Sequence, residues 1–356
     1  MAELNKDKQI PFIQKSGHKT AFLLYNFIMT YQNKKLGIFI VPTGIGASIG
    51  GYAGDASTYA REFSEYCNLI VNPNVVNAGC FSGITDNMLY VEGYIIDEFT
   101  KGNLNLLPAA KRNKIGIIFD KDIPQDVLNV HINTMNAVRT IYGLDIYGYD
   151  ITEESIGIDF ELNNGLSDGS VKNPNTIIDA GKRLLNKGCN AIAIVGMFND
   201  PNNANEEYAD GHGTDPVGGV EAILSHYISK ELHIPCAHSP AFEDYQIYPD
   251  IVNPKSASEY ITPTFLPCIL IGLSKAPKIV KENGISINDV DFLVMPYNSM
   301  GSPAVLGALE HNVKVYAVKE NITALNITAD KLQIKNNIYE VNTYKDCLNI
   351  INKIKK

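Results

Sequence analysis

Short apolar runs rich in β-branched residues alternate along this chain with longer segments of helical periodicity, and this alternation restricts the fold more than any other feature. The run GIFIV at 37–41 is typical of a buried strand, and a helical segment follows at 55–66. Further runs of the strand type lie at 67–71, 89–92, 115–119, 191–195, 234–238, 291–295 and 313–318. Strands that alternate with helices predict βαβ units, so we expect an α/β fold with parallel sheets flanked by helices.

The length of 356 residues exceeds the size at which a single hydrophobic core usually stops growing. We therefore expect two Rossmann-like lobes. The regions we distinguish are an N-terminal α/β region with a glycine-rich turn (1–110), a central α/β region with a histidine-containing loop and helix (111–277), and a C-terminal α/β unit (278–356). The C-terminal unit either stands alone or completes the sheet of the N-terminal lobe.

Charge and cysteine content restrict the partners and the compartment. The formal net charge of −9 disfavours binding to the phosphate backbone of nucleic acids. No apolar stretch is long enough to span a bilayer, and residues 1–14 lack the apolar core of a secretory signal. The six cysteines form no CxxC pair, which is typical of reduced thiols. We therefore predict a cytoplasmic protein with a small-molecule partner, no nucleic acid and no membrane partner; homo-oligomerisation stays open.

The turn after the first strand, PTGIGASIGGYAGD, is rich in glycine. Glycine lets backbone amides approach a ligand closely, and exposed amides favour an anion, so Thr43, Gly44 and Gly46 are candidate substrate-binding residues. No Gly-Lys-Ser/Thr follows, which excludes a P-loop, and the glycine spacing is one residue too long for a dinucleotide fingerprint. We therefore expect no cofactor. The alternative for this segment is a tight turn without a ligand.

Asparagine and serine side chains follow other strands at the edge where open α/β sheets bind ligands. Asn72, Asn74 and Asn77 follow the strand at 67–71, and each amide side chain can both donate and accept a hydrogen bond. The corresponding substrate-binding candidates in the C-terminal unit are Asn298, Ser299 and Asn321. The alternative for all of these residues is turn stabilisation, which asparagine provides routinely.

The segment from Gly196 to His238 contains the strongest candidates for chemistry. A long polar connection follows the strand before Gly196, and connections of this length are typical of lids. His238 ends a strand, and with His212 and Glu221 it forms a candidate acid/base set, since histidine exchanges protons near neutral pH. A metal site of His212, Asp215 and His238 is one alternative, although no HxH or HExxH spacing is present. The other alternative is that these side chains cap helices or make hydrogen bonds within the core.

Several unusual runs occur in one order along the chain: VPTGIGASIGGYAGDA, NPNVVNAG, LYVEGY, GTDPVGGVEAILSH, PCAHSPA, TFLPCILIGLSKAP and VYAVKEN. Together they resemble a conserved family of unknown function that occurs in bacteria and in plastid-bearing lineages. The resemblance covers about residues 35–330 and brings no assigned reaction. The family's typical HPNVLN run has a histidine where this chain has Asn72, which argues against a catalytic histidine there. Cys80 is not part of the family pattern, which weakens it as a candidate nucleophile.

These observations lead to one leading hypothesis and two alternatives. The leading hypothesis is a cofactor-independent enzyme that acts on a small anionic metabolite by acid/base chemistry, as an isomerase or racemase, or as a lyase or hydrolase. Glycine amides and asparagine side chains would hold the anion, and His238 with His212 or Glu221 would move protons. The alternatives are a metal-dependent hydrolase that uses His212, Asp215 and His238, and a non-catalytic sensor of a small metabolite.

Overall fold

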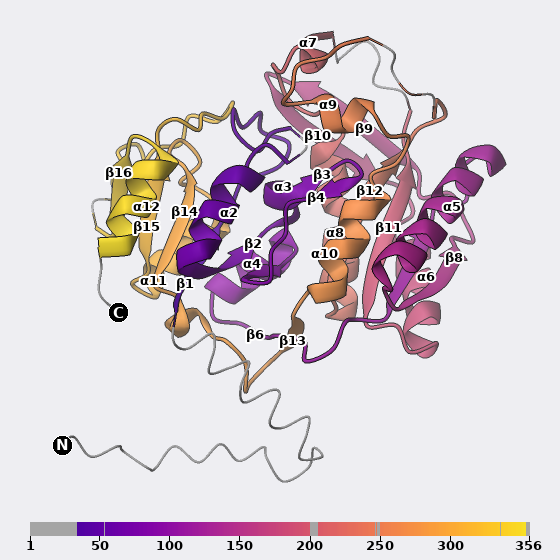
Figure 1. The fold of residues 1–356 in the computed structure, drawn as a ribbon, viewed down its shortest axis with the longest axis horizontal. Coiled ribbons are helices and arrows are strands. Elements are labelled where there is room, and N and C mark those ends of the chain that lie inside the picture. The colour runs from indigo at the N-terminus through magenta and orange to yellow at the C-terminus, as the bar shows by residue number, and fades with distance from the viewer. Residues whose placement is uncertain are drawn as a thin grey trace.

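The computed structural model describes most of the chain, namely residues 34–52, 54–199, 206–245, 247, 250–334 and 336–353. The prediction that the chain has no export signal depends on residues 1–14, which lie outside the described residues. Part of the polar connection predicted to be a lid, residues 200–205, also lies outside them. The described residues form two parallel sheets flanked by helices (Figure 1). The predicted α/β fold with parallel sheets is confirmed.

The first sheet has six parallel strands in the order β16-β15-β14-β1-β2-β5. Consecutive residues of β1, Ile38 and Phe39, enter different cores on the two faces of this sheet, which explains why the strand is a continuous apolar run. The last three strands come from the C-terminal unit and complete the sheet beside β1. The strands are β1 (Lys35–Phe39), β2 (Cys67–Val71), β5 (Met88–Tyr90), β14 (Phe292–Pro296), β15 (Lys314–Val318) and β16 (Ile338–Val341).

The second sheet has four parallel strands in the order β12-β11-β7-β8. Its inner strands are apolar throughout, whereas β8 at the edge alternates between buried and exposed residues. The strands are β7 (Ile115–Phe119), β8 (Ile146–Ile151), β11 (Ala191–Met197) and β12 (Cys236–Ala241). Three antiparallel pairs lie outside the sheets: β3 (Asn77–Ala78) with β4 (Phe81–Ser82), β6 (Asn105–Leu107) with β13 (Lys278–Val280), and β9 (Ile158–Asn163) with β10 (Leu166–Val171).

The helix α10 (Leu266–Lys275) lies between the two sheets and contacts β5 of the first and β11 and β12 of the second (Figure 1). Leu270 of this helix shares one core with Phe39 of the first sheet and Ala193 of the second. The two sheets are therefore packed into a single body. The other helices are α2 (Ser57–Tyr66), α3 (Pro73–Val76), α4 (Gly93–Thr100), α5 (Gln125–Tyr142), α6 (Pro174–Asn186), α7 (Glu206–Ala209), α8 (Gly218–Leu232), α9 (Ala257–Tyr260), α11 (Pro303–Glu310), α12 (Tyr344–Lys353) and the 3-10 turn Ile287–Asp289.

The β9–β10 hairpin connects the central region of the chain to the first sheet. It packs against α8, and the amide of Ser167 donates to the backbone oxygen of Gly44 in the glycine-rich turn (2.8 Å). The hairpin thus holds the turn after β1 against the start of α8. Among the described helices, none is long and apolar enough to cross a membrane.

Candidate active site

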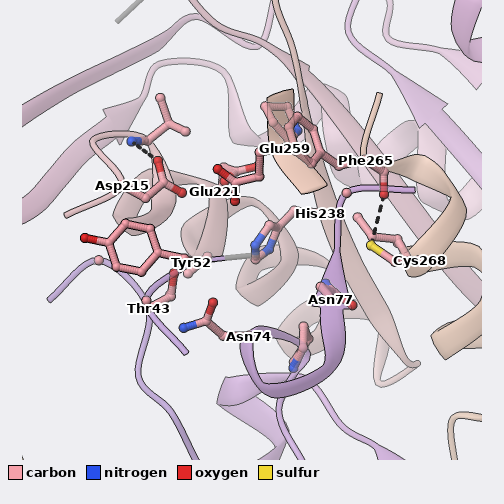
Figure 2. Close-up of a pocket in the computed structure, with 18 of the residues that line it drawn as sticks. Thr43, Tyr52, Asn74, Asn77, Asp215, Glu221, His238, Glu259, Phe265 and Cys268 are labelled. Carbon is pink, nitrogen blue, oxygen red and sulfur yellow. Dashed lines mark hydrogen bonds between the residues drawn. The ribbon is translucent and has the colours of Figure 1, made fainter. Parts of the chain in front are cut away.

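A cavity of about 610 Å³ lies where the turn after β1, the segment after β2 and the end of β12 meet, with α8, α9 and the residues before α10 completing its walls. Figure 2 shows side chains from these elements around one common space. Ligands of parallel α/β sheets bind at this edge, so the cavity is the candidate site. Of the residues that the sequence singles out, the cavity is lined by Thr43, Gly44, Gly46, Asn72, Asn74, Asn77, Asp215, Glu221 and His238, and His226 of α8 joins them.

Much of the glycine-rich turn is held by the protein itself. The amide of Ile49 donates to Oδ1 of Asn321 (3.0 Å). The amide of Gly50 donates to a carboxylate oxygen of Asp55 (2.6 Å). Burial raises the pKa of Asp55 to about 6, although the hydrogen bond from Gly50 works against that shift. Both amides already donate to side chains of the protein, so neither is free to hold an anion.

The three asparagines after β2 differ in how much of their hydrogen-bonding capacity is used. Asn72 joins the two strands, because its Nδ2 donates to the backbone oxygen of Val41 (2.8 Å) and its Oδ1 accepts from the amide of Val41 (3.1 Å). Nδ2 of Asn74 donates to the same oxygen (3.3 Å), and Oδ1 of Asn77 accepts from the Tyr90 hydroxyl (3.2 Å). Asn72 is thus structural, while Oδ1 of Asn74 and Nδ2 of Asn77 have no partner among the described residues and can meet a ligand.

The other predicted binding residues, Asn298, Ser299 and Asn321, lie outside the lining of the cavity. Nδ2 of Asn298 donates to the backbone oxygen of Thr323 (2.9 Å), and its Oδ1 accepts from the amide of Thr323 (3.1 Å). Oγ of Ser299 lies 3.2 Å from Oγ1 of Thr323. Nδ2 of Asn321 donates to the hydroxyl of Tyr344 (2.8 Å). These buried side chains stabilise the turns after β14 and β15, which is the alternative that the sequence left open.

A short chain of hydrogen bonds connects His238 to a buried carboxylate. Nδ1 of His238 lies 3.0 Å from Oγ of Ser225. The same Oγ lies 3.1 Å from the backbone oxygen of Ala222 and 3.3 Å from Oε1 of Glu92. The Ser225 hydroxyl has one proton, and when it donates that proton to the oxygen of Ala222 or Glu92 it cannot also donate to His238. Nδ1 of His238 then carries the proton of the 3.0 Å contact. We therefore assign the proton of His238 to Nδ1, so that Nε2 presents a lone pair to the cavity.

The two histidines around this carboxylate have opposite charge preferences. Burial lowers the pKa of His238 to about 3, and repulsion from His226 acts in the same direction, so His238 is neutral at physiological pH. Burial alone would also lower the pKa of His226, but its hydrogen bond to Glu92 and the charges of Glu92 and Asp97 raise that pKa above its ordinary value. Nε2 of His226 lies 2.9 Å from Oε1 of Glu92.

Three carboxyl groups from two helices and the loop before α8 line the same cavity (Figure 2). Asp215 accepts a hydrogen bond from the amide of Val217 (3.0 Å) in the turn just before α8 begins. Glu221 lies in the first turn of α8 and is 6% exposed, and its Oε1 has no hydrogen-bond partner among the described residues. Glu259 of α9 accepts from the hydroxyl of Tyr208 (3.2 Å).

Crowding of these groups in a buried place changes their protonation. Burial raises the pKa of Glu221 well above its ordinary value, and the charges of Asp215 and Glu259 add to that rise. Burial also raises the pKa of Asp215 to about 6, although the amides of Val217 and Gly218 stabilise its charged form. Burial and the neighbouring charges therefore favour the protonated form of Glu221, which is the form that can donate a proton.

The charge of the lining is one-sided. Among its described residues there is no lysine or arginine, whereas the carboxyl side chains are those of Glu92, Asp215, Glu221, Asp244 and Glu259. Cys268 also lines the cavity, but burial raises the pKa of its thiol to about 12, so it is a poor nucleophile. Cys80 lies outside the lining.

Sequence reasoning missed Tyr52, Tyr208 and Glu259, which all line the cavity. The rings of Tyr52 and Tyr208 lie 4.8 Å apart between centroids, and the hydroxyl of Tyr52 donates to the backbone oxygen of Gly213 (3.0 Å). Tyr208 and Glu259 belong to four-residue helices, α7 and α9, which have no periodicity to detect. The glycine-rich turn around Tyr52 was the one signal that could have pointed to this tyrosine.

The predicted His212 is exposed and lies outside the lining, whereas Asp215 and His238 belong to it. Within the part of the chain that the structure describes, no three His, Cys, Asp or Glu side chains are grouped closely enough to hold a metal ion. The described residues therefore offer no ligand set of the kind that the metal-hydrolase alternative requires.

Gly46 is held by a close approach as well as by its backbone conformation. It has φ +60°, and a β-carbon would lie 2.4 Å from Oγ1 of Thr214, which donates to the backbone oxygen of Gly165 (2.7 Å). Gly213 also has a positive φ, +82°, but a β-carbon there meets nothing within 4 Å. We expect Gly46→Ala to lower the free energy of unfolding by about 2–3 kcal/mol and Gly213→Ala by about 1 kcal/mol. Urea denaturation measures both; equal losses would show that the contact with Thr214 is unimportant.

Comparison with known proteins places this geometry in a family. Residues 36–356 match a family described as a protein of unknown function, DUF3326. The chain belongs to the DUF3326 family. This confirms the resemblance that the sequence runs indicated, and the match covers both sheets and the whole lining of the cavity in this DUF3326 chain.

One relative corrects a prediction. An uncharacterized lipoprotein of Synechococcus is 35% identical to this DUF3326 chain over 299 residues, which cover 82% of the chain and 83% of the relative. The predicted cytoplasmic location is wrong on this finding, because the relative is named as a lipoprotein. The prediction depended in part on residues 1–14, which lie outside the described residues. It also depended on unpaired cysteines as a sign of a reducing compartment, but five of the six cysteines are buried, and burial explains their lack of pairing equally well. No solved structure matches this DUF3326 chain.

Proposed function

We propose that this chain is a cofactor-independent enzyme that transfers protons on a small polar molecule bound in the cavity. One observation carries the proposal: His238 and Glu221 line the same cavity, where burial favours the uncharged form of each. Enzymes that use acid and base together at neutral pH separate the pKa values of two groups by their surroundings, and His238 and Glu221 are separated in this way.

Each residue has a distinct role in the proposed reaction. Nε2 of His238 accepts a proton from the substrate, and Ser225 with Glu92 holds the ring so that the positive charge formed on it is balanced by a nearby carboxylate. Glu221 donates its proton to the substrate at a second position. A proton removed at one atom and added at another describes an isomerisation, and a proton returned to the opposite face of the same carbon describes a racemisation. The same pair supports elimination when a bond to a leaving group breaks.

The charge of the lining favours a neutral or cationic substrate over the anionic metabolite that the glycine-rich turn predicts. The described lining supplies carboxyl groups without a lysine or arginine, and the amide of Val217 at the start of α8 is already bonded to Asp215. An anion in this cavity would meet these carboxyl groups without a lysine or arginine beside it, and His226, whose pKa is raised, is already paired with Glu92. The proposed reaction therefore stays acid/base proton transfer, but the proposed substrate is neutral or cationic rather than anionic.

Deuterium incorporation tests the proposal directly, because it detects proton transfer on whichever metabolite the protein accepts. The protein is incubated in D₂O with a small-molecule extract of bacterial cells, and metabolites are followed by mass spectrometry. We expect at least one metabolite to gain a carbon-bound deuteron with the native protein and not with Glu221→Gln. If no metabolite gains deuterium although one of them binds, the chain is a sensor and the proposal is wrong.

A further inference from the structure

The acidic side of the cavity contains an oxygen atom that lacks a partner. Oε1 of Glu221 is buried without a hydrogen bond from any described residue, in a side chain that is 6% exposed. Asp215 and Glu259 add their charges to the same place. A buried carboxyl oxygen without a donor is costly, because desolvation is not compensated by a hydrogen bond. The missing partner is therefore a donor or a cation supplied from the cavity.

We propose that Asp215, Glu221 and Glu259 bind an ammonium group, so that the substrate of this cavity is a small amine. A metal ion suits the group less, because the described residues contain no cluster with metal-ligand spacing. An ammonium group has three N–H donors and tolerates carboxyl groups that are too widely spaced for metal coordination. The proposal rests on the proposed function for the cavity but concerns binding alone.

Tyrosine rings beside the carboxyl groups add to this preference. Tyr52 and Tyr208 line the cavity with their rings in contact, and ring faces attract cations. The ring of Tyr52 already has such a neighbour, because Nζ of Lys255 lies 5.0 Å from its centroid while donating to the backbone oxygen of Ser48 (2.6 Å). Lys255 is not part of the lining, so its charge stays outside the cavity.

Binding of an amine here must depend on pH in a definite direction. Without ligand, burial favours the protonated form of Glu221, and Asp215, with a pKa raised to about 6, gains a proton as the pH falls. An ammonium group favours the ionised form of Asp215 and displaces its proton, while Glu221 accepts an N–H through its unprotonated oxygen and keeps its proton for the reaction. Affinity then rises by about tenfold per pH unit for each proton released. His226, with its raised pKa, becomes cationic at low pH and acts in the same direction, and the raised pKa of Tyr208 keeps its hydroxyl neutral throughout.

Three four-carbon probes that differ only in their end groups test the proposal: butane-1,4-diamine, butane-1,4-diol and succinate. Isothermal titration calorimetry with the full chain at pH 5.5 and 7.5 measures affinity, and repetition in buffers of different ionisation enthalpy measures proton release. We expect the diamine alone to bind, more tightly at pH 7.5 and with release of protons. Binding of succinate, equal binding of the diol, or no binding of the diamine at 10 mM overturns the proposal.

Asp215→Asn keeps the shape of the side chain and can still accept from the amide of Val217, but it removes the charge, so it should weaken diamine binding by on the order of tenfold or more and reduce proton release. Glu231→Gln also replaces a carboxylate by an amide, at an exposed position of α8, and should leave binding unchanged. If Asp215→Asn does not fold, Glu259→Gln carries the same expectation for affinity, since glutamine can still accept from the hydroxyl of Tyr208. Unaltered affinity in a folded variant overturns the proposal, whereas failure of deuterium incorporation with intact diamine binding would overturn only the catalytic role.

Discussion

His238→Asn is expected to reduce the rate of deuterium incorporation by about 100-fold or more while the protein stays folded. The backbone of His238 is fixed within β12, and its ring enters the cavity with Nε2 free to accept a proton. Asparagine retains a polar group that can meet Oγ of Ser225, so the loss of stability should be small. Its amide nitrogen has no basic lone pair with which to take the substrate's proton, so the chemistry should stop. Rates on the metabolite that the native enzyme labels, with thermal melting, measure both effects.

His233→Asn is the matched control. His233 ends α8 with φ +53°, a conformation that asparagine tolerates, and its side chain is exposed. This variant should keep native turnover and melting temperature. If His238→Asn melts many degrees lower yet keeps its turnover per folded molecule, then His238 has a structural role and Glu221 would need another partner as base.

Gly219→Ala is expected to lower the free energy of unfolding by about 3 kcal/mol, against the usual preference of helices for alanine. Gly219 lies in the first turn of α8, where a β-carbon would lie 2.2 Å from the backbone oxygen of Ser167. Oγ of Ser167 accepts from the amide of Gly219 (2.9 Å) and donates to the backbone oxygen of Pro216 (2.7 Å). If the added β-carbon pushes the hairpin away from α8, these two hydrogen bonds break as well. Guanidinium denaturation measures the loss.

Gly93→Ala supplies the comparison at the start of another helix. A β-carbon at Gly93 has its nearest neighbour, Nε2 of His226, at 3.5 Å, which is ordinary contact distance. Helix propensity should then dominate, and the variant should be as stable as the native protein or up to about 1 kcal/mol more stable. Similar stability changes for the two alanine variants would show that the approach of Ser167 to α8 does not restrict residue 219.

The sheet interiors could be predicted from the sequence, but the hairpin could not. Runs at 37–41 and 191–195 agree with β1 and β11 because strands covered on both faces are apolar throughout. The strands of the β9–β10 hairpin mix apolar and polar residues and are mostly half-buried or exposed, so they lack that continuous apolar signal. Its turn, Asn164-Gly165, has φ +52° and +75° and is a sequence pair typical of hairpins, which a closer search for turns could have found.

The candidate site was predictable where a sheet strand positions the residue. His238 was predicted to end its strand, but β12 continues to Ala241 and His238 is its third residue; the prediction still found a residue of the cavity, because the strand enters the ligand edge. Asn298 and Asn321 were assigned to the site because an asparagine that supports a turn and one that binds a ligand look alike in sequence. Glu259 depends on tertiary contacts of a short helix, which no local pattern encodes.

The pairing of β1 with β14 has a consequence for how the chain acquires its structure on the ribosome. Gly37 of β1 lies opposite Phe292 of β14, and a β-carbon at Gly37 would lie 2.2 Å from the ring of Phe292, so the glycine leaves room for that ring. β1 is made early, but one of its two hydrogen-bonding edges stays open until residue 292 has been synthesised. Such distant pairing slows folding, and an open apolar edge invites pairing with other chains. Nascent chains that end before β14 should therefore aggregate or require a chaperone, whatever the state of the second sheet.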